Sequence, residues 1–568
     1  MISFFRRPGT IALSLCFLVT GIAFSYDPPV GADDRYDLYS PLFLGRGFSV
    51  TSLESPTADV MNPAASGLTQ RTTLDASYIG LTAFGDSDEK RGWQGNVANL
   101  AASFPTRAGV ITGGLQFLHT NLDPIDLGTT LGLRASFAKD LYPDLLFGVG
   151  VSADYGGDAN NDLAVAGDLG IMYVPGDLGA LRDFRWGLSI LRMGVPYNPV
   201  DGSGVPSAFT PATGISFVPF RRDGVDLEVN TAVALPSFQN VRLSVGTELT
   251  IQDRVSLFGG WRGDVRELFN DDVESRSLLP SIGISVKFST DIPRNEDSVI
   301  SQQGWNQSEL NTRVAAAPMH DGIWAFGTGI NAPLGVIDRN PPEIAVDYDD
   351  TTFISPNNDG VKDALQFPAT IEDERYVMGY RFSIFNADGE LVREIRNKED
   401  RPENRTLENI VQRLLAVEEG IPVPETFRWD GRTDGGAVAP DGRYTFTLDA
   451  WDDNGNEGSE GPFEVVLDNT PPSAELEQLT VENRIFSPNG DGNKDSLIVN
   501  QSGSEELLWE GSVTEGGGSV VRTFDWADGS PGILEWNGQN DAGEFVPDGV
   551  YRYELSSQDR AGNSFETS

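Results

Sequence analysis

Residues 145–155, LLFGVGVSADY, alternate from Phe147 onward between apolar side chains and small or polar ones. Because a β-strand points successive side chains to opposite faces, this stretch has one apolar face and one small, polar face. The same alternation recurs at 241–249 (VRLSVGTEL) and at 282–288 (IGISVKF). The apolar face of the first stretch carries Leu145, Phe147, Val149, Val151, Ala153 and Tyr155, and the other face carries Gly148, Gly150, Ser152 and Asp154.

Segments of this kind follow one another through residues 73–335, with almost no helical pattern between them. A soluble β-sandwich or propeller would also give such alternation. Segments of about ten residues with small residues on the polar face favour a tilted crossing of a bilayer around a narrow lumen. We therefore predict an all-β chain with an antiparallel transmembrane barrel of about 12–14 strands. GIWAFGTGI (322–330) is the candidate last strand, Arg134, Arg242 and Glu248 should face the lumen, and Tyr78, Phe84, Trp186 and Trp261 are candidates for aromatic girdles.

The N-terminus has the pattern of an export signal. Arg6 and Arg7 precede an apolar or small stretch, 10–24, and Ala23-Phe24-Ser25 provides small residues before a predicted cleavage at Tyr26. Residues 1–25 are therefore predicted to be a signal peptide. The only cysteine, Cys16, lies inside it, so the mature chain has no thiol for catalysis, disulfides or metal binding.

The charge balance is strongly acidic, with 84 Asp and Glu against 41 Lys and Arg and a net charge of −43. Nucleic-acid binding needs clustered cations, so we expect no nucleic-acid partner. The chain has only two histidines and lacks a Gly-rich phosphate loop or a nucleophile elbow. We predict that it is not an enzyme, and calcium is the only ion or cofactor for which a candidate site stands out.

Residues 44–68, LGRGFSVTSLESPTADVMNPAASGL, precede the first predicted strand. Their Asp-containing stretch followed by Asn-Pro-Ala and Gly-Leu resembles the N-terminal segment of the FadL and PorV-like outer-membrane barrels, although Ala65-Ser66 is inserted before the glycine. The resemblance implies that 26–72 folds as a plug inside the barrel. It also implies passage of long-chain fatty acids or other hydrophobic molecules, or, in PorV-like relatives, a role in protein secretion. A tight Asn-Pro turn at the base of the barrel is the alternative. The candidate ligand or gate residues are Asp59, Asn62, Pro63 and Gly67.

The remainder of the chain contains a repeat. WDGRTDGGAVAPDGRYTFTLDAWDDNGN (429–456) aligns with WNGQNDAGEFVPDGVYRYELSSQDRAGN (536–563), and a Pro-Pro pair precedes each copy. The shared pattern resembles the Ig-like domain of the flagellar hook-capping protein FlgD. We predict two Ig-like β-sandwich modules, 336–470 and 471–568, with Trp429 and Trp536 as core residues.

Two Asn/Asp-rich loops are candidate cation sites. Oxygen-bearing side chains at alternate positions can converge on calcium, but Asx-turns explain the same composition, and neither loop has the bidentate Glu of an EF-hand. The loops lie near the start of each repeat. The candidate ligands are Asn357, Asp359 and Asp363 in the first, and Asn489, Asp491, Asn493 and Asp495 in the second.

Two further features concern the modules. Within the insert 398–425, apolar residues at helical spacing predict a short amphipathic helix that packs on the sandwich or on a neighbour. After Asn563 only SFETS remains, so we expect the second module to be incomplete and to lack its closing strand, and the chain to be a fragment of a longer one.

The leading hypothesis is a FadL-type outer-membrane channel whose modules lie in the periplasm as spacers or partner contacts. The expected partners are outer-membrane lipids, a hydrophobic small molecule and a periplasmic or cell-wall protein. The alternative is a PorV-like, non-transport component of secretion or envelope assembly.

Overall fold

The computed structural model describes residues 38–84, 91–120, 128–157, 162–195, 209–269, 279–293, 298–319, 322–348, 351–373, 376–398, 404–417 and 420–568. The predicted signal peptide and residues 26–37 of the predicted plug lie outside these ranges. The chain divides into two compact units, residues 1–337 with 401–418, and 338–400 with 419–568. Among the described residues, no helix is long and apolar enough to span a membrane.

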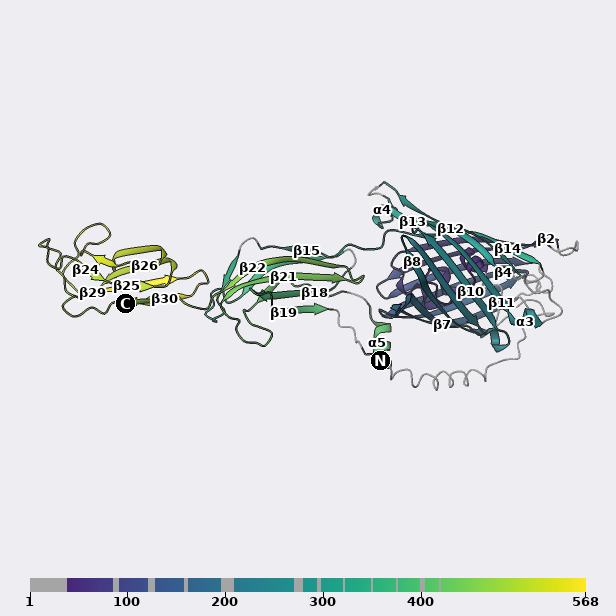
Figure 1. Cartoon of the computed structure of the whole chain (residues 1–568), viewed down its shortest axis with the longest axis horizontal. Helices are drawn as coiled ribbons and strands as arrows, with labels where there is room; N and C mark the ends of the chain where they lie inside the picture. Colours follow the sequence, from purple (N-terminus) through teal and green to yellow (C-terminus); the bar gives the residue numbers. More distant parts are fainter. Residues whose placement is uncertain are drawn as a thin grey trace. The chain divides into compact units, whose positions relative to one another are not determined.

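The first unit is built around a closed barrel of fourteen antiparallel strands (Figure 1). Each strand pairs with its neighbours in sequence, and β1 pairs with β14 from Thr73↔Pro333 to Ala83↔Ile323 to close the ring. The predicted last strand is confirmed as β14. The strands are β1 (Thr73–Phe84), β2 (Arg91–Thr106), β3 (Gly109–Thr120), β4 (Gly128–Tyr142), β5 (Leu145–Gly157), β6 (Asp162–Leu178), β7 (Leu181–Val195), β8 (Thr210–Arg222), β9 (Val225–Ala234), β10 (Arg242–Ile251), β11 (Val255–Asp264), β12 (Ser281–Asp291), β13 (Gln307–Pro318) and β14 (Ile323–Pro333).

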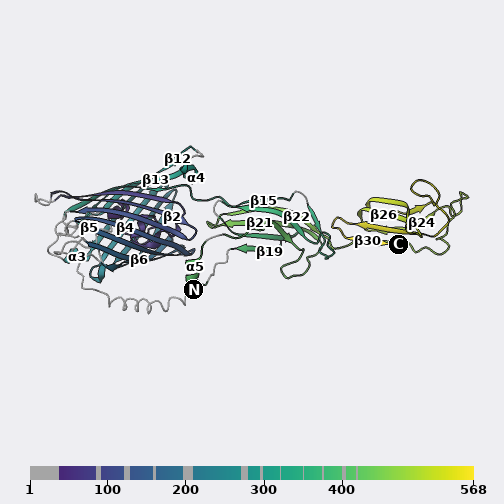
Figure 2. The same cartoon turned by 180° about the vertical axis from the view of Figure 1, so that it is seen from behind.

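The alternation that predicted the strands becomes the two faces of the wall. Val149 and Val151 are exposed on the outside of β5, whereas Ser152 and Asp154, on its other face, are buried. Figure 2 shows the same wall from behind, with β4, β5 and β6 side by side. The proposed girdle residues Tyr78, Phe84, Trp186 and Trp261 all have exposed side chains. The barrel therefore has an apolar exterior around a polar and apolar interior.

The two ends of the barrel differ in their connections. At one end, β2–β3, β4–β5, β6–β7, β8–β9 and β10–β11 are joined by two or three residues each, for example 143–144 and 252–254. This end also holds the start of β1, the end of β14 and the helix α4 (Val299–Gln302) of the β12–β13 connection. The other end has longer connections, such as 196–209 and the segment with α3 (Val265–Phe269). We refer to the first as the short-turn end.

The second unit contains smaller sheets consistent with Ig-like modules. In the first repeat, a three-stranded sheet faces a five-stranded one, and Phe367 of β17 lies 5.4 Å from Phe382 of β18 and 4.8 Å from Phe446 of β21, between ring centroids. Trp429 is fully buried beside them. The sheets run β15–β17–β20 and β16–β22–β21–β18–β19, with β15 (Glu343–Val346), β16 (Thr352–Ile354), β17 (Leu365–Glu372), β18 (Val377–Asn386), β19 (Leu391–Lys398), β20 (Thr426–Trp429), β21 (Gly442–Asp452) and β22 (Glu457–Leu467).

The second repeat forms a four-stranded sheet, β27–β26–β29–β30, and the pairs β23–β25 and β24–β28. Trp536 is buried, as predicted, with its ring 5.2 Å from that of Tyr551. A short closing strand is present, because Ser564–Thr567 pair with β29 and Phe565 packs on Trp509. It has four residues against the eleven of β22 in the first repeat, and the incompleteness of the second module stays a prediction. The bounds are β23 (Ala474–Leu476), β24 (Leu497–Val499), β25 (Gln501–Gly503), β26 (Glu506–Glu515), β27 (Val520–Gly529), β28 (Leu534–Trp536), β29 (Tyr551–Gln558) and β30 (Ser564–Thr567).

Candidate functional site

The lumen of the barrel is filled by the segment before β1. Residues 38–72 form α2 (Pro41–Arg46) and the 3-10 helices η3 (Thr57–Val60) and η4 (Pro63–Leu68). Figure 1 shows this purple segment inside the ring of strands. Most of its side chains are buried, including Phe43, Phe48 and Met61, although the segment is too short to form a core of its own. We call residues 38–72 the plug.

Glycines of the wall make room for the plug backbone. A Cβ added to Gly148 of β5 would lie 2.2 Å from the carbonyl carbon of Pro63, and one added to Gly170 of β6 would lie 2.0 Å from Oδ1 of Asn62. Contacts this short exclude any larger side chain unless the backbone moves. Small residues on the inner face were predicted to suit a narrow lumen, and direct packing against the plug is the reason for them here. Gly187, Gly246 and Gly260 meet the plug at similarly short distances.

Asn62 and Pro63 set the position of η4. Pro63 occupies the first turn, where its missing N–H is not needed, and Asn62 caps the helix by accepting from the Ala64 amide at 3.0 Å. The Nδ2 atom of the Asn62 side chain donates to two backbone carbonyls, that of Val50 in the plug at 2.9 Å and that of Ile171 in β6 at 3.2 Å. Asn62 therefore joins two turns of the plug to the wall.

Asp59 is the centre of a buried polar cluster. Its Oδ1 accepts from the Ser66 hydroxyl at 2.5 Å and its Oδ2 accepts from the hydroxyl of Ser136 in β4. The Ser66 oxygen in turn contacts Thr112 of β3 at 3.2 Å. Gly67 follows Ser66 and packs beside Leu146 of the wall. The structure thus brings Asp59, Asn62, Pro63 and Gly67 together in η3 and η4, against β3–β6.

Charged groups hold the other half of the plug. Arg46 pairs with Glu248 of β10 at 2.6 Å and with Glu228 of β9 at 3.3 Å, and Glu54 pairs with Arg313 of β13. The predicted inward direction of Glu248 is confirmed by its contact with the plug. Arg134 and Arg242 also face inward, because their guanidinium groups lie over the rings of Tyr39 and Phe48 at 5.1 and 5.4 Å.

These ion pairs were not predicted from the sequence. Charged residues that interrupt the inner face of a strand, such as Glu228 or Arg313, were the available signal, but alternation alone does not give the partner. The partners lie up to 259 residues apart, as for Glu54 and Arg313. A lumen is polar by default, so only the geometry distinguishes a plug contact from a water-facing charge.

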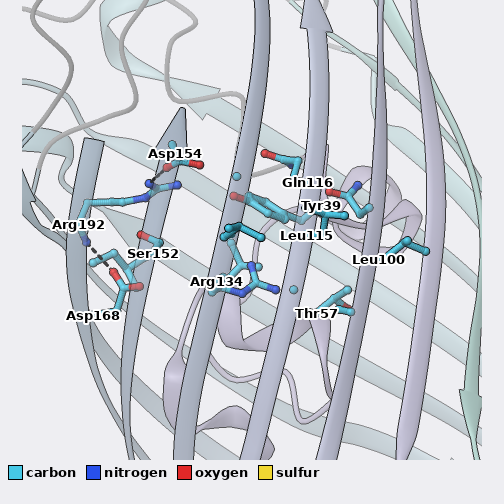
Figure 3. Close-up of a pocket in the computed structure, with 17 residues that line it drawn as sticks. Tyr39, Thr57, Leu100, Leu115, Gln116, Arg134, Ser152, Asp154, Asp168 and Arg192 are labelled. Atoms are coloured by element: carbon cyan, nitrogen blue, oxygen red, sulfur yellow. Dashed lines mark hydrogen bonds and ion pairs between the residues drawn. The ribbon is translucent and has the colours of Figure 1, made fainter. Parts of the chain in front are cut away.

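The described lumen keeps two open spaces beside the plug. A small pocket of about 20 Å³, shown in Figure 3, lies where Tyr39 and Thr57 of the plug face β2–β7. There Arg192 reaches from β7 to Asp154 of β5, and its backbone N–H donates to Asp168 of β6 at 2.7 Å. This pocket holds about one water molecule, so it is too small for an organic ligand.

The larger space has a volume of about 580 Å³ and lies at the short-turn end. Leu42, Leu53 and Leu68 of the plug form part of its lining, and β10–β14 provide charged groups such as Lys287 and Glu309. This volume lies within the usual range for a small-molecule site. The cavity lies at the end of the barrel where the plug continues into β1.

The two candidate calcium loops share one conformation. Both carboxylate oxygens of Asp363 accept backbone N–H groups, from Asn358 and Gly360, and Asp495 does the same in the second loop with Gly490 and Gly492. Asn357 and Asn489 each donate to the carboxylate two residues on, Asp359 and Asp491, and Asn493 offers its backbone amide to Asp491. These are Asx-turn contacts, the alternative that the sequence left open. Calcium binding at these loops stays a prediction.

A third group of carboxylates was not singled out by the sequence. Asp338, Asp373 and Asp452 of the second unit offer oxygens within 4.8 Å of one another. The signal was weak, since Asp338 stands before the first Pro-Pro pair and Asp452 begins an Asp-x-x-x-Asn turn. Both carboxylate oxygens of Asp452 already accept hydrogen bonds, from the backbone amides of Asn454 and Asn456 and the side-chain amide of Asn456, so we assign no metal here.

Comparison with known proteins gives similarity in structure only. No family model matches the sequence, and no curated protein matches it. The solved structures that resemble the chain include the CymD monoaromatic hydrocarbon channel, with 11% identity over 54% of this chain and 99% of that one at a TM-score of 0.35. The Ralstonia pickettii toluene transporter TbuX has 12% identity over 53% and 100%, with a TM-score of 0.34. A Pseudomonas aeruginosa FadL homologue has 12% identity over 52% and 98%, with a TM-score of 0.29. At these identities and TM-scores, the similarities assign neither family nor function to the chain.

Proposed function

We propose that this chain is an outer-membrane channel of the FadL type for hydrophobic small molecules, such as long-chain fatty acids, and that residues 38–72 are its gate. The observation that carries the proposal is the plug, which fills a closed barrel with an apolar exterior. A closed barrel has no unpaired strand edge, so it satisfies the backbone hydrogen bonds that a bilayer cannot. A barrel with a purely structural role in the membrane would not need a separate segment packed inside its lumen.

The chemistry of the lumen supports a hydrophobic cargo. A water-filled pore has a polar interior, whereas apolar side chains of this wall reach inward and pack with the plug. Leu146, Met172 and Leu191 gather around Phe43 and Met61. If the plug moved, these side chains would line the opened path. The 580 Å³ cavity at the short-turn end is the space into which such a path would lead.

The connections support an orientation. In outer-membrane barrels the short turns face the periplasm and the longer loops face outward. The start of β1 and the end of β14 both lie at the short-turn end, so the plug would join the wall on the periplasmic side and the Ig-like modules would lie on that side too. In this proposal the modules are spacers or contacts to a periplasmic or cell-wall partner.

Native mass spectrometry of the full chain, purified from membranes in mild detergent, tests the proposal. We expect a bound free fatty acid or similar acyl ligand that is absent from an unrelated barrel purified in parallel. A barrel that stays empty after oleate is added would contradict hydrophobic transport. It would leave the PorV-like role in secretion or envelope assembly, for which co-purifying secretion proteins would be the evidence.

A further inference from the structure

The helix α5 (Leu407–Leu415) belongs in sequence to the insert between β19 and β20, but it packs with the barrel. The sequence predicted the helix and left its partner open. Thr406 caps it by accepting from the Asn409 amide at 3.2 Å. Figures 1 and 2 both show α5 beside the rim of the barrel at the short-turn end.

Specific contacts attach α5 to the β4–β5 hairpin. Arg413 is buried, donates to the carbonyl of Leu141 at 2.7 Å and lies over the Tyr142 ring at 4.2 Å. Arg405, just before the helix, lies over the same ring at 5.0 Å and pairs with both oxygens of Asp144 at 2.5 and 2.7 Å. Two guanidinium groups therefore lie over one aromatic ring, and the helix has a defined face toward the barrel.

The register of β4 shows that α5 lies on the outer surface. Ser136 contacts Asp59 in the lumen, so residues of β4 that lie an odd number of positions from Ser136 point outward. Leu131 and Leu133 are accordingly exposed. Lys139 also points outward but is buried, because its ammonium group donates to the carbonyl of Ala416 directly after α5. The helix thus covers the outward row of β4 at the point where that row reaches the short-turn end.

A second face of α5 is apolar and uncovered. Leu407, Val411 and Leu415 recur every four residues, which places them within an arc of about 80°. Their exposed fractions are 82%, 52% and 76%. Glu408 and Gln412 follow them on the next arc and are exposed as well. The helix therefore has a barrel side, an apolar side and a polar side.

We propose that α5 is an in-plane membrane helix, with Leu407, Val411 and Leu415 inserted among the acyl chains of the leaflet at the short-turn end. Helices with a strong apolar face, a polar face and low overall hydrophobicity lie in the interface plane of a bilayer. The row of β4 that α5 covers continues directly into Leu133 and Leu131 of the apolar exterior, so the stripe extends an existing lipid-facing surface. The proposal rests on the barrel being in a membrane, as proposed above.

The level of α5 on the barrel also favours lipid over a protein partner. Leu145, at the start of β5, pairs with Tyr173 of β6, and Tyr173 pairs with Trp186 of β7. Tyr and Trp concentrate where headgroups meet acyl chains. Together with Tyr142 under the helix, they form an aromatic row at the height where an interfacial helix would lie.

Site-specific fluorescence tests the proposal in the full chain. Cys16 is the only cysteine, so single cysteines can be placed in a Cys16→Ser background and labelled with the polarity-sensitive fluorophore NBD. Val411→Cys probes the apolar side, and Gln412→Cys, also exposed, is the matched control on the polar side. Leu133→Cys reports the barrel wall. The labelled chains are reconstituted into phosphatidylcholine vesicles that carry a doxyl-lipid quencher, and aqueous iodide is added in parallel.

We expect NBD at positions 133 and 411 to be quenched severalfold more by the doxyl lipid than by iodide, and NBD at position 412 to show the reverse. If 133 is quenched by lipid but 411 responds like 412, the helix lies in water and the inference is wrong while the barrel proposal stands. Shielding of 411 from both quenchers would mean a protein covers the stripe, which also overturns it. If 133 is not quenched by lipid, the membrane location itself fails.

Discussion

Replacing Asn62 by Ala should release the plug. The substitution removes the cap of η4, which is typically about 1 kcal/mol. It also removes the hydrogen bonds that the Asn62 side chain donates to the buried carbonyls of Val50 and Ile171, and each lost bond costs roughly 1 kcal/mol. Together these losses destabilise the docked plug by about 3 kcal/mol. Because every 1.4 kcal/mol changes an equilibrium constant tenfold, the fraction of molecules with a released plug should rise roughly a hundredfold.

Hydrogen exchange of the full chain in detergent measures this population. Amides of the plug exchange through its release, so exchange within 44–66 should accelerate by about two orders of magnitude while β-strand amides keep their rates. Asn311→Ala is the control, because the side-chain bond of Asn311 runs to Asn331 of the neighbouring strand at 3.5 Å and not to the plug. Unchanged exchange of the plug in Asn62→Ala would refute the reasoning, since it would show that these hydrogen bonds do not hold the segment.

Three further changes test other contacts. Gly148→Ala should displace the plug at a cost of about 1–3 kcal/mol, because its Cβ would lie 2.2 Å from the Pro63 carbonyl carbon, and limited proteolysis should then cut residues 38–72 faster than in Gly113→Ala, where the added Cβ meets nothing closer than 4.0 Å. Trp429→Ala should destabilise the first module by about 3–5 kcal/mol, since the side chain is fully buried, and calorimetry of the full chain should show a lowered transition for the second unit with the barrel unchanged. Burial raises the pKa of Tyr553 to about 12. The folded module therefore keeps the phenol protonated above about pH 10, where the phenol of the unfolded chain loses its proton. Stability of the second module should therefore fall as pH rises from about 10 to about 12, and Tyr553→Phe should flatten that dependence.

The strands could be predicted from the sequence because their signal is local. Alternation over ten residues is decided by neighbours in the chain, and GIWAFGTGI at 322–330 was identified as a last strand without any knowledge of its partner β1. The burial of Trp429 and Trp536 followed from the repeat for the same reason. The number of strands was less certain, because it depends on how the sheet closes.

Contacts between distant segments could not be predicted in this way. Gly148 appeared as one small residue among several on an inner face, yet it is packed against Pro63, 85 residues earlier in the chain. The helix α5 was expected from its apolar spacing, but its attachment to Leu141 and Tyr142 joins residues about 270 positions apart. Periodicity reports which side of an element is buried, and it contains no information on what buries it.

The kind of contact that holds the plug is itself informative about a gate. Replacing a buried ion pair with well-packed apolar residues is often neutral or stabilising, so pairs such as Arg46–Glu248 and Arg313–Glu54 are weak evidence for stability. They are better understood as contacts that define one docked position, since removing either partner leaves an unpaired buried charge. A plug fixed only by apolar packing could shift along the lumen with little penalty. In the proposed gate, the charged contacts at one end and the Asn62 and Asp59 hydrogen bonds at the other would fix the plug in a single register, so that it would open only when several polar contacts are exchanged together, for water or for a ligand.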